Sequence, residues 1–456
     1  MGNSKNIIWI VVFSLLIGTF TQDIYAFVTI LFTSLILLNF LRNSNQYFVF
    51  REWVLFLYSL NYLVSPMIAY QIDGNSAIFE MKIEYSEYFN LAIPGILFFY
   101  LGLNLFKTKV FEVNINSLKK TSALNTTFLI WITIVAILIR LFNEEFQNSL
   151  KFFLYLISLL RYVGSFSLFA VNPKKNWFWP VIVLGIDLYY SLLIGMYHDF
   201  IMWLIFFTIF YLVILKPTIR MKVFLLISLS SLVLFFQAFK LAYREKVWSE
   251  GSEANLSIVA DVGQSKMNSD SIIGIKNLLS TLNRGNQAWI FASTVDNMNT
   301  QKNFQSLALV NQYLEAALLP RFLAPNKIES GSNEIFNKFS GHKINDKTSM
   351  GLGIFADGYI AYGTWGVYIF GFILGLIFSI TFKLVERWTK VSPFYVLLLL
   401  PLLNYAVRPD CELQTTINHL FKGILLYGFL VYLTRKRFTL DSQENKRKLL
   451  HLNLMK

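Results

Sequence analysis

The chain has 456 residues, of which 55% are hydrophobic, 17% aromatic and only 15% charged. Its mean hydropathy of +0.51 is far above that of soluble globular proteins and excludes that class. The net charge is +13, and the single cysteine excludes an internal disulfide and a multi-cysteine metal site.

Apolar runs long enough to cross a hydrocarbon layer of about 30 Å recur along the chain. They predict an all-α, polytopic integral membrane protein of about 12 transmembrane helices. In chain order, the expected spans are 7–20, 24–41, 53–70, 88–106, 126–142, 152–171, 177–195, 200–215, 223–239, 359–382, 393–407 and 417–433. The first run has no small-residue cleavage site and leads almost directly into the second, so we interpret it as a retained span.

The basic residues gather on one side of this arrangement. With the N-terminus in the cytoplasm, the cytoplasmic segments carry 22 of the 40 Lys and Arg residues but only five of the 27 acidic residues. This bias is typical of bacterial plasma membrane proteins and places both termini in the cytoplasm. Because the whole positive excess lies there, no nucleic-acid partner is expected, and the lipid bilayer is the expected partner of the basic tail.

One connection differs from the others in length. Residues 241–358 join the ninth and tenth spans on the outer side, so the chain divides into 1–240 with nine spans, the outer loop 241–358, 359–434 with three spans, and the basic tail 435–456. Within the loop, 272–298 and 306–322 have apolar residues at helical spacing and predict amphipathic helices, the second ending at Pro320. A loop of this length predicts a functional role.

Several classes of chemistry lack sequence support. The chain has no phosphate-binding loop, no dinucleotide fingerprint, no zinc-protease helix motif and no serine-esterase elbow, and its four histidines are not at metal-ligand spacing. We therefore expect no cofactor and no metal. The reaction must use a substrate that carries its own activation energy.

Two charged residues fall in the middle of predicted spans. Arg161 in the sixth span and Asp187 in the seventh lie at similar depth in antiparallel helices, which predicts a buried ion pair. A role in a substrate path is the alternative.

Cationic residues recur beside apolar helix ends on the outer side. They are Lys240 and Arg244 in QAFKLAYR, Arg284 in LNRGNQAW, Arg321 and Lys327 in LLPRFLAPNK, and Arg408 in YAVRPD. A guanidinium in such a setting binds a diphosphate through paired hydrogen bonds, although lipid headgroup contact is the alternative for each residue. A lipid diphosphate that carries a sugar is an activated glycosyl donor, because the stabilised diphosphate can leave without a nucleotide or metal.

Glycosyl transfer with inversion also needs a base for the acceptor hydroxyl. Asp357 in IFADGYIAYGTWG is the favoured candidate, because the glycines around it allow close backbone approach where the loop re-enters the membrane. Capping of the tenth span is the alternative for Asp357. The other candidate bases are Asp410, Glu412, His342 and His419. Tyr359 and Tyr362 suit either sugar stacking or the aromatic belt of the membrane interface.

Taken in order, QAFKLAYR, RGNQAWI, LLPRFLAPNK, GLGIFADGYIAYGTWG and YAVRPDCE resemble the second half of Wzy-type polymerases, which join lipid-linked oligosaccharide repeat units into O-antigen, capsular or other exported polysaccharide. The resemblance implies a growing glycan on undecaprenyl diphosphate as donor and one lipid-linked repeat unit as acceptor. It implies functional roles for Arg244, Arg284, Arg321 and Arg408. We expect catalysis from Asp357, Arg284 and Arg321, and substrate binding from Lys240, Tyr243, Arg244, Asn286, Gln287, Trp289, Lys327, Tyr359, Arg408 and Asp410.

Two other functions remain open on the sequence. An O-antigen ligase shares the architecture and depends on an outer-loop histidine, for which His342 in SGHKIND is the candidate. A flippase for lipid-linked oligosaccharide would need charges at several depths, whereas the mid-membrane charges are essentially Arg161 and Asp187. A chain-length regulator and a flippase are the expected protein partners of a polymerase.

Overall fold

The computed structural model describes residues 22–71, 80–142, 148–244, 287–302, 304–319, 323–324, 327–344 and 349–439, with a few positions before residue 22 and between 246 and 262. These residues form helices and no strand. The helices are α2 (Ile24–Asn43), α3 (Phe50–Ser59), the π-helix η1 (Leu60–Val64), α4 (Ser65–Gln71), α5 (Tyr85–Leu103), α6 (Ile115–Leu124), α7 (Thr126–Phe142), α8 (Asn148–Ser158), α9 (Leu160–Val171), α10 (Phe178–Ile194), α11 (His198–Leu215), α12 (Ile219–Arg244), α15 (Ala288–Gln301), α16 (Leu307–Leu318), α17 (Asn333–Ser340), α18 (Ile354–Val391), the 3₁₀-helix η4 (Pro393–Leu398), α19 (Leu399–Ala406) and α20 (Leu413–Phe438).

The fold is that of an α-helical membrane protein. In the described part of the chain, eight segments are long and apolar enough to cross a bilayer, or nine if α6 and α7 form one bent span. Each predicted span from 24–41 onward falls on helical structure, but the helices Phe178–Ile194 and Pro393–Ala406 are shorter than a full crossing, and most of 7–20 lies outside the described residues. The predicted number of 12 spans and the side that faces the cytoplasm stay predictions.

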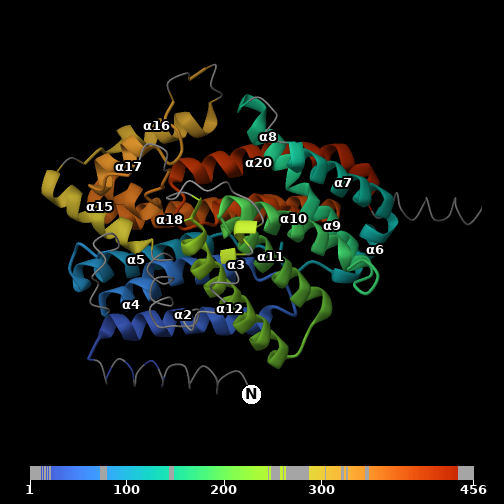
Figure 1. Ribbon diagram of the computed structural model, residues 1–456, viewed down its shortest axis with the longest axis horizontal. Helices are drawn as coiled ribbons and strands as arrows, with labels where there is room; N and C mark the ends of the chain where they lie inside the picture. Colours follow the sequence, from blue (N-terminus) through green and yellow to red (C-terminus); the bar gives the residue numbers. More distant parts are fainter. Residues whose placement is uncertain are drawn as a thin grey trace, which may run out of the picture.

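The long helices run roughly along one axis (Figure 1), and α5 packs lengthwise against α18. Glycines make this contact possible. A Cβ on Gly375 of α18 would lie 2.3 Å from the Phe99 carbonyl of α5, and one on Gly102 of α5 would lie 2.2 Å from the Phe372 carbonyl. Small residues let membrane helices approach backbone to backbone, so these two helices form a closely packed centre for the bundle.

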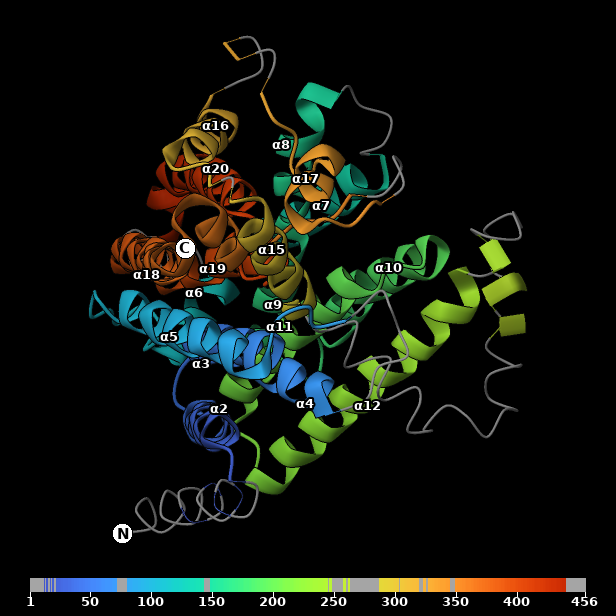
Figure 2. The same cartoon turned by 90° about the vertical axis from the view of Figure 1, so that its left-hand side faces the viewer.

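Segments predicted on the cytoplasmic side touch one another. The Asn45 amide donates to the Pro217 carbonyl (2.9 Å), and the Lys383 ammonium donates to the Lys107 carbonyl (3.1 Å). The helices α15, α16 and α17, which come from the predicted outer loop, lie together at one end of the molecule, and Figure 2 views the structure from that end. Both groupings fit the alternating order of spans.

The chain departs from straight spans at three places. The helices α6 and α7 meet at 81° around Asn125, whose amide donates to the Thr121 carbonyl. The predicted span 53–70 contains the π-helical turn η1. The helix α18 turns a corner at Tyr362 and Gly363, where Gly363 has φ +59°. Its first piece, Ile354 to Ala361, is fully buried. The corner therefore separates the part of α18 that carries Asp357 from the part that packs against α5.

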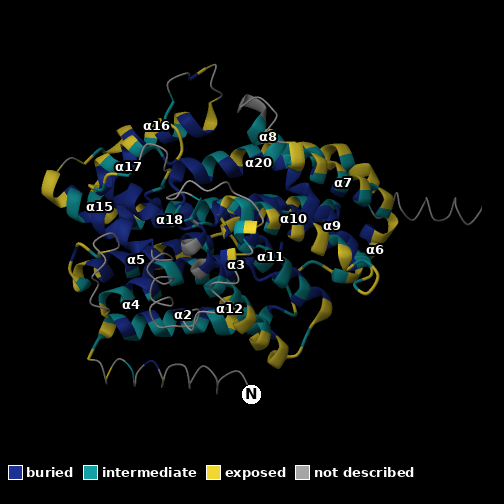
Figure 3. Ribbon diagram, in the orientation of Figure 1, coloured by how far each residue is buried: buried dark blue, intermediate teal, exposed yellow. Residues whose placement is uncertain are grey.

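Burial follows the membrane character of the chain. Buried residues fill the middle of the bundle, and exposed residues lie at its periphery (Figure 3). Many exposed positions are large and apolar, among them Trp131 on α7, Phe224 on α12 and Phe429 on α20, which are about 60% exposed. Such surfaces are the ones expected to face lipid tails.

The predicted mid-membrane ion pair is confirmed. The Arg161 guanidinium lies 2.7 Å from a carboxylate oxygen of Asp187, and both side chains are buried. The Tyr162 hydroxyl also donates to this carboxylate, and Arg161 donates to the Ser158 carbonyl at 2.7 Å. A buried charge is tolerated when it is paired and hydrogen-bonded in this way, so the pair holds α9 against α10.

Candidate functional site

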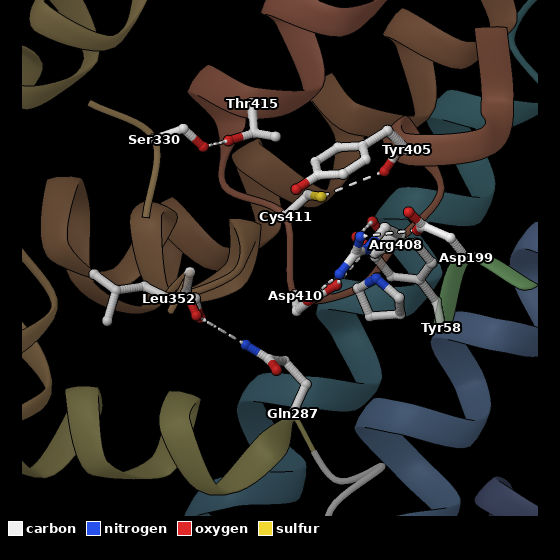
Figure 4. Close-up of polar contacts among 12 residues, drawn as sticks. Tyr58, Asp199, Gln287, Ser330, Leu352, Tyr405, Arg408, Asp410, Cys411 and Thr415 are labelled. Carbon is white, nitrogen blue, oxygen red and sulfur yellow. Dashed lines mark hydrogen bonds and ion pairs between the residues drawn. The ribbon is translucent and has the colours of Figure 1, made fainter. Parts of the chain in front are cut away.

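Three segments far apart in the sequence meet at the end of the bundle that carries α15 to α17. The Gln287 amide donates to the Gly351 carbonyl (3.2 Å), and Figure 4 shows it reaching the neighbouring Leu352 carbonyl as well. A Cβ on Gly351 would lie 2.2 Å from the Asp410 carbonyl. The predicted need for glycine before Asp357 is thus explained by direct backbone contact with the segment Arg408 to Glu412.

Gly353 is needed for a second reason. Its φ is +83°, a conformation that residues with a side chain rarely adopt, and a Cβ there would lie 2.6 Å from the Tyr62 hydroxyl. The same hydroxyl donates to the Pro409 carbonyl at 2.9 Å. The turn before α18, the segment 408–412 and the π-helical part of the third predicted span are therefore locked together.

Asp357 is buried and both of its carboxylate oxygens are hydrogen-bonded. One accepts from the Leu413 backbone N–H (2.8 Å) and the other from the Tyr313 hydroxyl (3.2 Å). Leu413 is the first residue of α20, so Asp357 satisfies a free N–H at the start of that helix and not at the start of its own. The carboxylate therefore ties α18 to α20 and to α16.

Glu412 is a second buried carboxyl, next to Asp357. It accepts a hydrogen bond from the Gly331 backbone N–H at 3.4 Å. Burial and the neighbouring Asp357 carboxylate raise the pKa of Glu412 to about 8. Three residues after Glu412, in the first turn of α20, the Thr415 hydroxyl is hydrogen-bonded to the Ser330 hydroxyl (Figure 4). The turn at Ser330 and Gly331 is thus fixed by hydrogen bonds to Thr415 and Glu412 at the start of α20.

Arg408 lies in a cluster of balanced charges (Figure 4). Its guanidinium is 3.0 Å from Asp410 and 3.6 Å from Asp199, and it lies 4.5 Å from the centre of the Tyr405 ring. Burial would raise the pKa of Asp410, but the charge of Arg408 outweighs it and the pKa is lowered. The Asp199 and Asp410 carboxylates are about half exposed, so an anionic ligand could displace them from the guanidinium.

Lys240 belongs to the same neighbourhood. Its charge acts on the His198 ring together with those of Arg408, Asp410 and Asp199. Two of the expected substrate-binding residues, Arg408 and Asp410, are therefore in direct contact, and Lys240 acts electrostatically on the same histidine. Cys411 lies between this charge cluster and Glu412, and its thiol donates to the Tyr405 carbonyl at 3.3 Å.

A polar cavity of about 700 Å³ opens beside Gly331, the residue that donates to Glu412. Its walls come from α16, from residues 327–332 and from α17. The turn at Ser330 and Gly331 belongs to its lining and rests on Thr415 and Glu412. The cavity volume lies within the range of small-molecule sites.

Other expected site residues have structural contacts. The Tyr243 hydroxyl donates to the Leu193 carbonyl (2.8 Å), and the Tyr359 hydroxyl donates to the Asn299 side chain (2.6 Å). Trp289 is buried with its ring edge-on to His342. The Lys327 ammonium donates to the Ala316 and Leu319 carbonyls, so it caps the C-terminal end of α16 while also lining the cavity.

Several expected residues lie outside the description. Arg284, Asn286 and Arg321 fall outside the described residues, as does the side chain of Arg244. The expected catalytic pair of arginines, Arg284 and Arg321, is therefore untested by the geometry. The exposed Tyr362 marks the corner of α18.

The two candidate histidines have different surroundings. His419 is buried and hydrogen-bonded to the Pro401 carbonyl (2.9 Å), so it packs α20 against α19. His342 is half-buried and hydrogen-bonded to the Ser293 hydroxyl (2.9 Å), and burial followed by the charge of Lys82 lowers its pKa. Within the described ranges, no three His, Cys, Asp or Glu side chains are placed to hold a metal ion.

Comparison with protein families identifies one match. Residues 87–390, well over half of the chain, match a family described as a domain of unknown function (DUF8712). The chain belongs to the DUF8712 family. No curated protein and no solved structure matches it. The DUF8712 region runs from the first turn of α5 to the end of α18, so it contains Asp357 and the cavity walls but not the segment Arg408 to Glu412.

Sequence reasoning missed three residues that shape the site. Tyr313 occupies a position in the apolar pattern of its helix, where it reads as a packing residue. Asp199 and His198 stand at the start of an apolar run, where they read as a span boundary. The available signal was a His-Asp pair at a predicted outer helix end, which is weak on its own.

Proposed function

We propose that this protein is a membrane glycosyltransferase that polymerises oligosaccharide repeat units carried on undecaprenyl diphosphate, at the outer face of a bacterial plasma membrane. The product is an O-antigen, capsular or other exported polysaccharide. The observation that carries the proposal is the meeting of Gln287, Gly351 and Asp410 beside a polar cavity at one end of the bundle. These residues come from three of the segments that resemble the polymerases.

The charge cluster supports a role in holding a diphosphate. Arg408 and Lys240 supply positive charge, and the partly exposed carboxylates of Asp199 and Asp410 keep the guanidinium in place until a phosphate replaces them. Arg284 and Arg321 complete the cationic set in this proposal. The acceptor hydroxyl oxygen bonds to the anomeric carbon of the donor sugar as the bond from that carbon to the diphosphate breaks. The hydroxyl proton passes to Asp410, one of the candidate bases, and the cations stabilise the charge that develops on the departing diphosphate.

Asp357 enters the proposal as a positioning residue. Its two hydrogen bonds hold Tyr313 and the start of α20, and its carboxylate is buried away from the cavity surface. Through Leu413 it fixes the adjacent segment that carries Arg408. This role requires no proton transfer by Asp357.

Gene deletion followed by analysis of the surface glycan tests the function. A strain that lacks a polymerase keeps a single repeat unit on its acceptor and loses the ladder of longer chains. Accumulation of long chains on the lipid carrier would instead identify a ligase, and loss of both products would identify a flippase. Either of these two patterns would overturn the proposal.

Complementation tests the arginines. We expect Arg284→Ala and Arg321→Ala to lose the ladder at normal protein levels, because each removes a cation from the diphosphate. Arg408→Lys should lose it too, because lysine cannot form the paired hydrogen bonds of a guanidinium. Arg387→Ala is the matched control, since Arg387 is exposed near the opposite end of α18. Full ladders from all three site variants would remove these arginines from the mechanism.

A further inference from the structure

The cavity between α16 and α17 has a lining chemistry of its own. Two lysines, Lys327 and Lys338, are balanced by two glutamates, Glu329 and Glu334. The described lining contains no arginine. Since a diphosphate requires net positive charge, the cavity is a poor site for that part of a lipid-linked substrate.

One of the two lysines is also committed elsewhere. The Lys327 ammonium donates to two carbonyls at the end of α16 (3.0 and 2.8 Å). The Lys338 ammonium lies 5.0 Å from the centre of the Phe339 ring. Lys327 is therefore held by α16, and the charge of Lys338 is matched by the glutamates of the same lining, so net charge does not select the ligand.

Amide and hydroxyl groups make up most of the remaining lining. The amides belong to Gln305, Gln312 and Asn333, and the hydroxyls to Ser330, Ser332 and Ser349. Each amide offers donors and an acceptor. The Ser330 and Ser349 hydroxyls are bonded to Thr415 and Gly331 and keep part of their hydrogen-bonding capacity for a ligand. This inventory matches a neutral ligand rich in hydroxyl groups, which itself presents both donors and acceptors.

The cavity is connected to the buried carboxyls through its lining. The Ser349 hydroxyl donates to the Gly331 carbonyl (3.0 Å), while the Gly331 N–H donates to Glu412 (3.4 Å). The lining residue Gly331 therefore connects the cavity to Glu412, and Tyr313, which follows the lining residue Gln312, connects it to Asp357. This places it beside the segment that carries Arg408, where the diphosphate of the proposed substrate is held.

We propose that the cavity between α16 and α17 binds the uncharged sugars of the lipid-linked glycan, and that the diphosphate binds outside it. This inference rests on the proposed function for the identity of the glycan. It adds a separate saccharide subsite whose principal contacts are Gln312 on α16 and Asn333 on α17.

Binding to the full chain in lipid nanodiscs tests the subsite. One probe is the oligosaccharide released by mild acid from the lipid-linked pool of the cells that make this protein, and the other is inorganic pyrophosphate. We expect Gln312→Ala and Asn333→Ala each to weaken oligosaccharide binding roughly tenfold, the equivalent of about one good hydrogen bond. Pyrophosphate binding should be unchanged in both variants.

Asn311→Ala is the matched control, because Asn311 is exposed beside Gln312 on α16 but does not line the cavity. It should bind both probes as the wild-type chain does. Three outcomes would overturn the subsite. The wild-type chain fails to bind the oligosaccharide, the cavity variants bind it as tightly as the wild-type chain, or those variants lose pyrophosphate binding.

The glycan ladder separates the two proposals. If deletion removes the ladder but Gln312→Ala and Asn333→Ala bind oligosaccharide normally, the polymerase proposal stands and the subsite fails. If deletion leaves the ladder intact but the cavity variants lose oligosaccharide binding, the subsite stands and the polymerase proposal fails.

Discussion

The carboxylate of Asp357 accepts a hydrogen bond from the backbone N–H of Leu413 at 2.8 Å, across 56 residues of sequence. It therefore stabilises the start of α20 from a neighbouring helix. The Tyr313 hydroxyl occupies the other carboxylate oxygen. The arrangement makes Asp357 a joint between three helices.

Removing this joint should destabilise the protein. Asp357→Ala leaves the buried Leu413 N–H and Tyr313 hydroxyl without a partner, at an expected cost of about 1–3 kcal/mol in the free energy of unfolding. Asp357→Asn keeps one acceptor oxygen, so it should lose less and retain the glycan ladder. Thermal unfolding in detergent measures the loss of stability in Asp357→Ala. The control Glu315→Ala, at an exposed position of α16, should leave the melting temperature unchanged. A stable Asp357→Asn protein without a ladder would instead favour a catalytic base.

Glu412 should make stability depend on pH. Its pKa is about 8 in the folded protein against an ordinary value of 4.5, so below pH 4.5 both states hold the proton. As the pH rises towards about 8, the unfolded state releases the proton first and the fold loses stability, with no further loss above that pH. Glu412→Gln should flatten this part of the curve, as measured by melting temperature between pH 4.5 and 8.5. Parallel curves for the two proteins would refute the assignment.

The net contribution of the Arg161–Asp187 ion pair to the free energy of unfolding should be smaller than the loss of stability on removing one partner. Asp187→Ala leaves a buried guanidinium uncompensated and should cost about 3–5 kcal/mol. The double replacement Arg161→Leu with Asp187→Leu removes both charges and should recover much of that loss. A double-mutant cycle of unfolding free energies measures the coupling. A normal glycan ladder from the double variant would confine the pair to a structural role, and its loss would favour the substrate path.

The corner of α18 should not tolerate a side chain. A Cβ on Gly366 would lie 1.8 Å from the Gly358 carbonyl, so Gly366→Ala forces the two pieces of the helix apart. We expect a marked fall in the amount of folded protein recovered from membranes. Gly185→Ala in α10 is the matched control, because a Cβ there meets nothing within 4 Å, and alanine should stabilise the helix by about 0.5–1 kcal/mol. Equal yields of the two variants would contradict this account.

Much of the architecture could be predicted from local pattern. Apolar runs located the helices, and the shared depth of Arg161 and Asp187 predicted their contact, because a buried charge in a membrane needs a partner. The glycines at 351 and 353 predicted close backbone approach, which the contacts with the Asp410 and Pro409 carbonyls confirm. These features depend on composition and spacing along a single helix or turn.

Long-range partners left no such signal. Nothing local links Tyr313 to Asp357, or Gly331 to Glu412, because each contact depends on how separate helices are brought together. The helix α6, which precedes the 81° bend at Asn125, was missed because its polar and basic residues, Lys119 and Lys120 among them, look like an ordinary connection between spans. The cavity arises from three segments whose residues read individually as ordinary loop polar groups.

The lone thiol of Cys411 is buried against the Tyr405 carbonyl. Reagents that cannot enter the packed interior should therefore leave it unmodified, so cysteines introduced elsewhere can be addressed one at a time in the natural background. A membrane-impermeant maleimide applied to intact cells that carry Arg284→Cys would report directly on which compartment that stretch occupies.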